Sequence, residues 1–358
     1  MSKTLNVASF FSGCGGFDLG FEEAGFNIAM ASDFWEPAAN TFKRNFPNTE
    51  FILDDIKNLD KYRLRDILRR KNIEKIHVVI GGPPCQCFTR LNNNNRRRDD
   101  ERNQLFRQYL RMIDILQPDF VVMENVADLL VRTDMDDNPF RDLITSSFEN
   151  IGYKVAYHVF KTEKYGVPQK RRRVIFLATN KQIELSFPEE SYGESTAGEF
   201  LKKIKGLKDL KNHEVTESGS AIIKRMKHIP QGGYYENLPE HLKVKKIRKG
   251  KLVTVKRYGS YLRRIHLHEP SMTITNNYIV HPEKNRFLTN REKATLHTFP
   301  SDFEFCGTLG HVSQQIANAV PPEFARRIAE HIKQYYRPQR TNFVPYILAK
   351  LAGPLQIA

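Results

Sequence analysis

The sequence of 358 residues contains little cysteine and no long apolar run. Its four cysteines, Cys14, Cys85, Cys87 and Cys306, form no CxxC pair, so neither a zinc site nor a disulfide framework is predicted. No stretch approaches the ~18 consecutive apolar residues that a membrane helix needs, and no signal-peptide pattern follows Met1. We therefore expect a cytoplasmic protein with reduced thiols, no membrane association and no bound metal.

The sequence also lacks heptads and internal repeats, which excludes coiled coils and solenoids. Its length suits one large domain and a smaller one. Lysine and arginine number 56 against 41 aspartates and glutamates, a net charge of +15, and much of the excess lies after residue 200. Although a run of cations is often only a solvated surface, an excess of this size favours a polyanionic partner, and nucleic acid is the first candidate.

Short apolar strands alternate with helical stretches over the first 180 residues, which predicts an α/β fold. The expected strands cover residues 7–11, 27–32, 51–53, 77–80, 120–123, 155–160 and 174–178. The first strand leads through a glycine turn, Ser12–Gly16, into a helix over Phe17–Ala24 that Gly25 ends. This turn lacks the Gly-x-Gly-x-x-Gly dinucleotide fingerprint, so a nicotinamide enzyme is disfavoured.

Acidic residues follow the second and third expected strands. Asp33 and Phe34 follow the second, about 20 residues beyond the glycine turn, where a carboxylate can accept hydrogen bonds from ribose hydroxyls. Asp55 and Ile56 follow the third. These positions predict a site for an adenosine-bearing cofactor, with Phe34 stacked on the adenine. The alternative is that both aspartates only cap helices, because each precedes a helical stretch.

Cys85 follows the fourth expected strand, after two glycines and two prolines. Proline fixes φ and has no backbone N–H, so the segment before the thiol should be stiff. The carboxyl end of a strand in an open α/β sheet is also where ligands bind. Cys85 is thus a candidate nucleophile, although a lone cysteine is often a small buried apolar residue.

Two polar groups follow later strands. Glu124 lies at the end of the fifth expected strand, where a buried carboxylate is costly unless it has a function. It is a candidate proton donor, and the alternative is a structural bond to a helix N-terminus. Lys170–Arg173 are four consecutive cations, which by themselves suit phosphate binding.

Together these motifs resemble the cytosine-5 DNA methyltransferases in type and order. The resemblance rests on Phe11–Phe17, Asp33–Phe34, Asp55–Ile56, Pro84–Gln86, Glu124–Val126, Gln169–Arg173, Pro270–Ile274, Arg286–Pro300 and Gln315–Pro322. The chain differs from the family at Asp33, where glutamate is more common, and over Lys293–His297, where an Ala-Arg-Leu-Gln run is usual. The resemblance implies a Rossmann-like, S-adenosylmethionine-dependent methyltransferase domain and a smaller, mostly irregular or β target recognition domain.

The resemblance also implies roles for individual residues. Cys85 would add to C6 of a flipped cytosine, Glu124 would donate to N3, Arg173 would stabilise charge at O2, and Arg171 would hold the site together. The implied cofactor-binding residues are Phe11, Gly13, Cys14, Gly15, Gly16, Asp33, Phe34, Asp55, Ile56, Gly82, Pro84, Leu105, Asn318 and Ala319. The implied DNA-binding residues are Gln86, Arg90, Arg96, Arg97, Gln169, Arg263, Arg264 and Thr273, and the loop Asn92–Arg98 is a candidate lid.

By this resemblance, residues 1–180 with about 310–340 form the catalytic domain, about 181–309 form the recognition domain, and 341–358 are an unassigned tail. We expect a monomer, associated with the bacterial nucleoid, that methylates a short double-stranded DNA sequence as the modification half of a restriction-modification system. A cognate restriction endonuclease would then act on the same site. Two alternatives stay open at this point: a transfer RNA cytosine-5 methyltransferase of the same fold, and a catalytically silent DNA-binding module.

Overall fold

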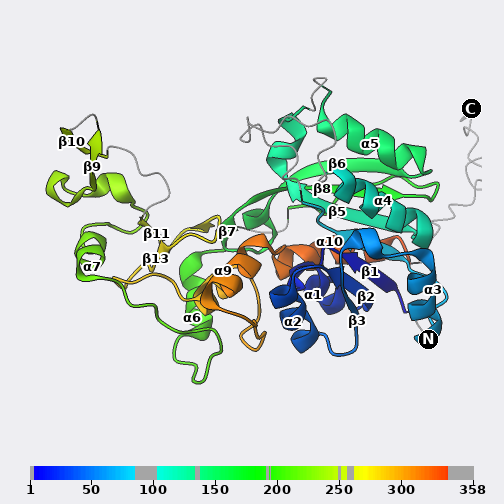
Figure 1. Ribbon diagram of the computed structural model, residues 1–358, viewed down its shortest axis with the longest axis horizontal. Helices are drawn as coiled ribbons and strands as arrows, with labels where there is room; N and C mark the ends of the chain where they lie inside the picture. Colours follow the sequence, from blue (N-terminus) through cyan, green and yellow to red (C-terminus); the bar gives the residue numbers. More distant parts are fainter. Residues whose placement is uncertain are drawn as a thin grey trace, which may run out of the picture.

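A seven-stranded sheet in the order β3-β2-β1-β4-β5-β8-β6 forms the centre of the larger lobe (Figure 1). The computed structural model describes residues 4–84, 103–133, 138–190, 193, 195–248, 251–255 and 262–337. The strands of the sheet are β1 (Asn6–Phe10), β2 (Asn27–Asp33), β3 (Glu50–Leu53), β4 (Val78–Gly81), β5 (Phe120–Val126), β6 (Lys154–Lys161) and β8 (Arg172–Thr179). All the strands expected in the first 180 residues therefore form, and the predicted α/β class is confirmed.

The strand order reverses beside β1. This strand pairs in parallel with β2 on one side and with β4 on the other, and β5 continues the parallel part of the sheet. β8 runs antiparallel between β5 and β6. A ligand site is expected at such a reversal, outside the carboxyl ends of the strands, and the segments that follow β1, β2, β4 and β5 all meet at this edge.

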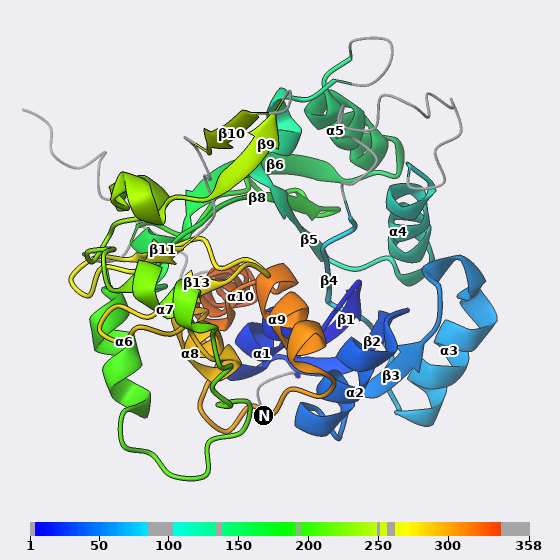
Figure 2. The ribbon, with the colours of Figure 1, turned by 60° about the vertical axis from the view of Figure 1, so that its left-hand side comes forward.

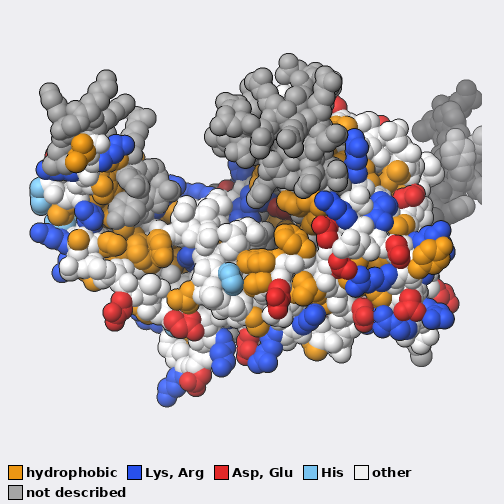
Figure 3. Space-filling model, in the orientation of Figure 1, with side chains coloured by type: hydrophobic (Ala, Val, Ile, Leu, Met, Phe, Trp, Pro, Cys, Tyr) orange, Lys and Arg blue, Asp and Glu red, His pale blue; other side chains and the backbone are white. Residues whose placement is uncertain are grey.

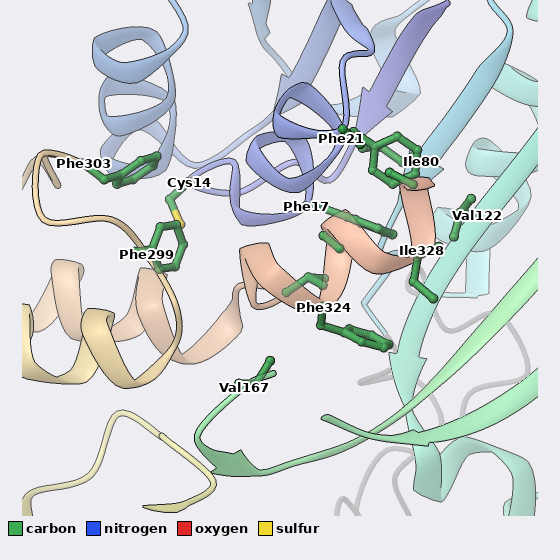
Figure 4. Close-up of a cluster of buried hydrophobic side chains, with 14 of the residues drawn as sticks. Cys14, Phe17, Phe21, Ile80, Val122, Val167, Phe299, Phe303, Phe324 and Ile328 are labelled. Atoms are coloured by element: carbon green, nitrogen blue, oxygen red, sulfur yellow. The ribbon is translucent and has the colours of Figure 1, made fainter. Parts of the chain in front are cut away.

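Helices cover both faces of the sheet (Figure 2). They are α1 (Gly16–Glu23), α2 (Glu36–Asn45), α3 (Lys61–Arg70), α4 (Asn103–Leu116), α5 (Phe140–Asn150) and α10 (Pro322–Gln334). Side chains alternate along the strands: Val78 and Ile80 of β4 join the cluster of α1 and α10, whereas Val79 joins that of α3, α4 and α5. Figure 4 shows the first cluster, in which Phe17 and Phe21 of α1 lie near Phe324 and Ile328 of α10.

A smaller lobe lies to one side of the sheet (Figure 1). It contains α7 (Ser220–Met226), the hairpin β9 (Lys245–Arg248) and β10 (Lys251–Thr254), and the pair β11 (Arg263–Arg264) and β13 (Ile279–Val280). Its own apolar cluster comprises Met226, Ile229, Tyr235, Leu238, Leu262 and Val280. In the described part of this lobe, short strands and short helical turns replace the regular alternation of the first 180 residues.

The segments between the lobes are α6 (Ala197–Ile204), β7 (Gln169–Lys170), β12 (Ser271–Met272), α8 (Asn290–Leu296) and α9 (Leu309–Asn318). β7 pairs in parallel with β12, which joins the end of the sheet to the smaller lobe. Ala294 and Leu296 of α8 belong to the same apolar cluster as α1 and α10. Among the described residues, no helix has the length and apolar character needed to cross a bilayer.

Gly20 allows the close packing of α1 on α10. A Cβ atom at this position would lie 2.4 Å from the Pro322 carbonyl oxygen and 2.5 Å from the Arg326 backbone nitrogen. Alanine at an exposed helix position would add about 1 kcal/mol of helix propensity. Here we expect Gly20→Ala to lower the free energy of unfolding by about 1–3 kcal/mol, because backbone atoms of α10 must move.

Urea denaturation measures this effect. The matched control is Gly219→Ala, because a Cβ at Gly219 meets no heavy atom within 4 Å. A Gly20→Ala protein as stable as the unmodified one would mean that α1 and α10 separate without cost, contrary to this packing.

Candidate active site

A cavity of about 160 Å³ opens at the carboxyl ends of β1, β2 and β3. Its lining is Phe11, Ser32, Asp33, Phe34, Asp54, Asp55, Ile56, Lys57 and Leu105. Six of these residues, Phe11, Asp33, Phe34, Asp55, Ile56 and Leu105, are among those expected at a cofactor. The structure therefore brings together side chains from three strand ends and from α4, and the cavity combines an apolar wall with carboxylates.

Asp33 is fixed at the end of β2 by two backbone N–H groups. Oδ2 accepts from Gly13 at 2.9 Å and Oδ1 accepts from Trp35 at 2.9 Å. Burial raises the pKa of this carboxyl group, and the bonds from the Trp35 and Gly13 N–H groups oppose that rise. Because Trp35 is the N-cap of α2, Asp33 is not simply a helix cap and instead joins the glycine turn to β2.

Phe34 and Asp55 differ in how their side chains are held. The ring of Phe34 is 70% exposed at the cavity, as a stacking surface requires. Asp55 caps a short 3-10 helix, where its carboxylate accepts from the Lys57 backbone N–H at 3.0 Å. The capping alternative therefore holds for Asp55, although its side chain also lines the cavity.

The glycine turn packs against protein atoms. Gly15 has φ +92°, and a Cβ there would lie 2.4 Å from the ring of Phe46. A Cβ on Gly16 would lie 2.4 Å from the Val320 carbonyl oxygen. The resemblance assigns Gly15 and Gly16 to the cofactor, but in the structure it is the packing of the end of α2 and of the segment before α10 that requires glycine at these two positions.

The Cys14 thiol is also turned into the protein. It donates to the Gln315 carbonyl oxygen at 3.7 Å, and burial raises its pKa to about 12. The remaining residues expected at the cofactor do not line this cavity, namely Gly13, Gly15, Gly16, Gly82, Pro84, Asn318 and Ala319. Sequence reasoning missed Ser32, Asp54 and Lys57, whose only signal was that they adjoin the residues it chose.

Glu124 and Arg173 form an ion pair at the carboxyl end of β5. Arg173 Nε lies 2.6 Å from Glu124 Oε1, and the side chains are only 14% and 12% exposed. The antiparallel register of β5 and β8, which sets Val126 opposite Arg173, brings the two together. The expected alternative for Glu124, a bond to a helix N-terminus, is thus replaced by a contact with a neighbouring strand.

The same strand end holds the segment that leads to Cys85. Asn125 Nδ2 donates to the Pro83 carbonyl oxygen at 3.0 Å, within a buried contact. A Cβ on Gly82 would lie 3.3 Å from Glu124 Oε2. The ends of β4 and β5 are therefore tied together one residue before Pro84. Cys85 itself lies outside the described residues.

Arg171 is buried beneath this site. Its Nη2 donates to the carbonyl oxygens of Ala317 and Ala319, both at 3.1 Å. Burial, with the nearby Arg173 charge, lowers the pKa of Arg171 to about 9, against the opposing effect of Glu124. Arg171 thus connects β8 to the end of α9, in keeping with the expectation that it holds the site together.

An open groove with a volume of about 470 Å³ adjoins Arg173. Its lining is Val126, Ala127, Asp128, Lys161, Glu163, Lys170, Arg172, Arg173 and Thr273. Four of the nine are cations and two are acids, so the groove suits an anionic ligand. Figure 3 shows the surface hollowed between the two lobes, with Lys and Arg side chains near the floor.

Two residues expected at DNA are instead buried. Arg264 donates to the Ile229 carbonyl oxygen at 2.8 Å, to that of His281 at 2.7 Å and to that of Met226 at 2.6 Å. Gln169 is fully buried, and its side-chain amide bonds to other protein groups. Both positions are corrected here, because neither side chain reaches the surface. Sequence could not reveal this, since the bonding partners lie far along the chain.

Of the other residues expected at DNA, the structure describes two, Arg263 and Thr273. Arg263 is exposed, and Thr273 lines the groove with its hydroxyl donating to the Lys170 carbonyl oxygen at 2.7 Å. Gln86, Arg90, Arg96, Arg97 and the candidate lid Asn92–Arg98 lie outside the described residues. Within the described part of the chain, no three His, Cys, Asp or Glu side chains are grouped to hold a metal ion.

Comparison with known proteins finds a matching family model, similar sequences and a similar solved structure. The family model for C-5 cytosine-specific DNA methylase matches residues 5–334. The chain is 36% identical to type II methyltransferase M1.HphI of Haemophilus parahaemolyticus over 92% of this chain and 87% of the relative, and 32% identical to M.NgoFVII of Neisseria gonorrhoeae over the same shares. A structure described as a candidate DNA modification methyltransferase of an Escherichia coli prophage superposes with a TM-score of 0.74 at 24% identity, covering 92% of this chain and 99% of that one.

Proposed function

The chain belongs to the C-5 cytosine-specific DNA methylase family and is a DNA cytosine-5-methyltransferase, and from this premise we propose how it acts. It transfers a methyl group from S-adenosylmethionine to C5 of a cytosine within a specific short double-stranded DNA sequence. Its biological role is the modification half of a restriction-modification system, as the names of its type II relatives suggest. It acts as a monomer alongside an endonuclease for the same site.

One observation carries the proposed chemistry: the Glu124–Arg173 pair lies beside the segment that leads into Cys85. Cytosine C5 is too weak a nucleophile to accept a methyl group unaided. Addition of the Cys85 thiolate to C6 forms an S–C6 bond and moves the C5–C6 π electrons toward C5, N3 and O2. A proton donor at N3 and a cation at O2 both stabilise that shift. Glu124, once it has taken up a proton from solvent, supplies the first group, and Arg173 supplies the second.

The contacts of Arg173 support this assignment. Its Nε is paired with Glu124 and its Nη1 donates to the Arg172 carbonyl oxygen at 2.7 Å. Within the described residues, these contacts leave Nη2 for cytosine O2. After methyl transfer, a base removes the C5 proton, the S–C6 bond breaks, and Cys85 leaves as the thiolate.

The cavity beside β2 fits S-adenosylmethionine. Its exposed Phe34 ring suits adenine, and the Asp33 carboxylate suits a ribose hydroxyl, while Ile56 and Leu105 supply apolar walls. When bound, S-adenosylmethionine supplies an electrophilic methyl group. The chain's own part is to hold the adenosine against Phe34 and Asp33, at the same sheet edge as Glu124.

The basic groove supports DNA as the substrate. Lys161, Lys170 and Arg172 line it together with Arg173, so phosphates of a strand along the groove would meet cations close to the reacting base. Because C5 and C6 of cytosine lie inside the base stack of a duplex, the base must be flipped out, at a cost of a few kcal/mol. The smaller lobe then belongs to the recognition domain of about 181–309.

Bisulfite sequencing of plasmid DNA tests this function. Unmethylated plasmid is incubated with the protein and S-adenosylmethionine, and both strands are sequenced. Protected cytosines confined to one short recurring sequence support the reaction, the base and the specificity together. If cofactor binding is measured by calorimetry but no cytosine is protected, DNA is excluded, and an RNA substrate or a silent binder takes its place.

Asp33 provides a separate test of the cofactor site. We expect Asp33→Asn to weaken S-adenosylmethionine binding by about 10- to 100-fold, because a charged hydrogen-bond acceptor contributes roughly 1.5–3 kcal/mol. Isothermal titration calorimetry measures the affinity. The control is Glu36→Gln, which removes the same charge from an exposed position nearby. Equal affinities of Asp33→Asn and unmodified protein would remove Asp33 from the cofactor site.

A further inference from the structure

A buried chain of hydrogen bonds runs from the segment after β12 to the end of α9. The Ile274 backbone N–H donates to Gln169 Oε1 at 2.9 Å. Gln169 Nε2 lies 2.9 Å from His297 Nδ1, and His297 Nε2 lies 2.8 Å from the Ala319 carbonyl oxygen. The side chains of Gln169 and His297 are fully buried, so these contacts take the place of hydrogen bonds to water for their polar atoms.

Backbone groups at the two ends fix the direction of every bond in this chain. Ile274 N–H can only donate, so the Gln169 oxygen faces it and the Gln169 NH₂ group faces His297. The Ala319 carbonyl can only accept, so His297 carries its proton on Nε2 and accepts at Nδ1. Burial and the nearby charges of Arg171 and Arg173 hold the pKa of His297 well below its ordinary value, which keeps the ring neutral.

The Ala319 carbonyl joins this chain to the active site. It accepts from Arg171 Nη2 at 3.1 Å as well as from His297. Arg171 lies two residues before Arg173, the partner of Glu124. On its other side, the Ala319 methyl group would lie 3.1 Å from a Cβ built on Gly16, in the glycine turn. Ala319 therefore lies between Arg171, the residue just before β8, and the turn before α1.

Backbone strain next to His297 indicates that its position is tightly determined. Thr298 has φ +68°, a left-handed conformation that costs a β-branched residue of order 1–3 kcal/mol. The Thr298 hydroxyl accepts from the Glu323 backbone N–H at 3.1 Å, which ties this turn to α10. The surrounding structure thus holds the end of α8 in a conformation that aims the imidazole at Ala319.

We propose that His297 is a positioning residue for methyl transfer. Its neutral imidazole fixes the Ala319 carbonyl, which Arg171 also contacts, and the Gln169 amide, which contacts Ile274. In this way it aligns the Glu124–Arg173 pair with the segment at Ile274. Ile274 lies in the predicted recognition domain, so the chain of hydrogen bonds links that domain to the reacting base. This inference rests on the proposed function. In this role, His297 itself touches neither the cofactor nor DNA.

Two substitutions at this position separate hydrogen bonding from packing. Leucine fills much of the space but makes no hydrogen bond, so His297→Leu should lower the single-turnover methylation rate at saturating DNA and cofactor by about 10-fold or more. Glutamine can accept from Gln169 with Oε1 and donate to Ala319 with Nε2, so His297→Gln should stay within about 3-fold of the unmodified rate. The affinity for S-adenosylmethionine should be unchanged in both. His311→Leu, on an exposed histidine, is the control.

Two results overturn the inference: an unmodified single-turnover rate in His297→Leu, whether or not its melting temperature falls, or an equal loss of rate in both variants. If the unmodified protein methylates no duplex, the proposed function fails instead. Nitrogen-15 NMR of histidine-labelled protein then tests the hydrogen-bond chain without activity. A neutral ring with its proton on Nε2 across about pH 6–8 supports the chain, and protonation or the other tautomer contradicts it.

Discussion

Replacing Cys85 with serine is expected to abolish methylation while leaving the affinity for S-adenosylmethionine nearly unchanged. Free cysteine has a pKa of about 8.5, so a modest stabilisation yields a thiolate near neutral pH, whereas a serine hydroxyl stays protonated without a strong base. We expect kcat to fall on the order of 10⁴-fold or more. The cofactor site should be unaffected, because its described cavity is formed by residues from β1, β2, β3 and α4.

The chain offers a matched control two residues away. Cys87→Ser removes a second thiol from the same segment and should retain activity. A duplex with 5-fluorocytosine at the target position gives a further readout, because fluorine cannot leave C5 as a proton does and the S–C6 bond then persists. Full activity of Cys85→Ser, or a covalent adduct formed through Cys87, would reassign the nucleophile.

The fold could be predicted from the sequence because most of its signals are local. Each parallel strand is buried on both faces and therefore appears as a short apolar run, as in β4 and β5. The end of α1 was also marked locally, because Gly25 adopts φ +83° just beyond it. The pocket residues Asp33, Phe34 and Asp55 followed from the rule that ligands bind at strand ends.

The cation run Lys170–Arg173 shows where such reasoning fails. In sequence its four residues are equivalent, but in the structure Arg171 alone of the four is buried, and Arg173 lines the groove together with Lys170 and Arg172. Arg171 is 2% exposed and bonds to Ala317 and Ala319, whereas Lys170 and Arg172 line the groove. The contact between Glu124 and Arg173 depends on the register of β5 against β8, which no local pattern encodes.

Arg264 is a second instance. The resemblance implied a DNA contact for this residue, but its guanidinium binds backbone carbonyl groups from two separate segments of the smaller lobe, one at Met226 and Ile229 and the other at His281. Burying a cation is costly unless its donors are satisfied, and here carbonyl oxygens satisfy them. Because those carbonyls are brought together only by folding, a basic residue that organises a lobe cannot be told in sequence from one that contacts DNA.

Glu124→Gln is expected to slow the covalent step by about 10²- to 10³-fold, while DNA affinity changes little. Glutamine keeps the size of the side chain and can still accept from Arg173, but it carries no acidic proton for cytosine N3. It also removes the carboxylate that pairs with Arg173 Nε at 2.6 Å before Glu124 takes up its proton. Addition of the thiolate would then leave the developing charge on the ring without its proton donor. Single-turnover kinetics with excess enzyme isolates this step from product release.

Glu163→Gln is the matched control, since Glu163 lines the same groove and loses the same charge. If the rate depends only on the net charge of the groove, both variants should slow equally. If Glu124 donates to the base, only Glu124→Gln slows, and DNA with 5-fluorocytosine should form its covalent adduct more slowly in that variant alone. An unchanged single-turnover rate in Glu124→Gln would remove Glu124 from the mechanism and leave Arg173 as the group that stabilises the ring.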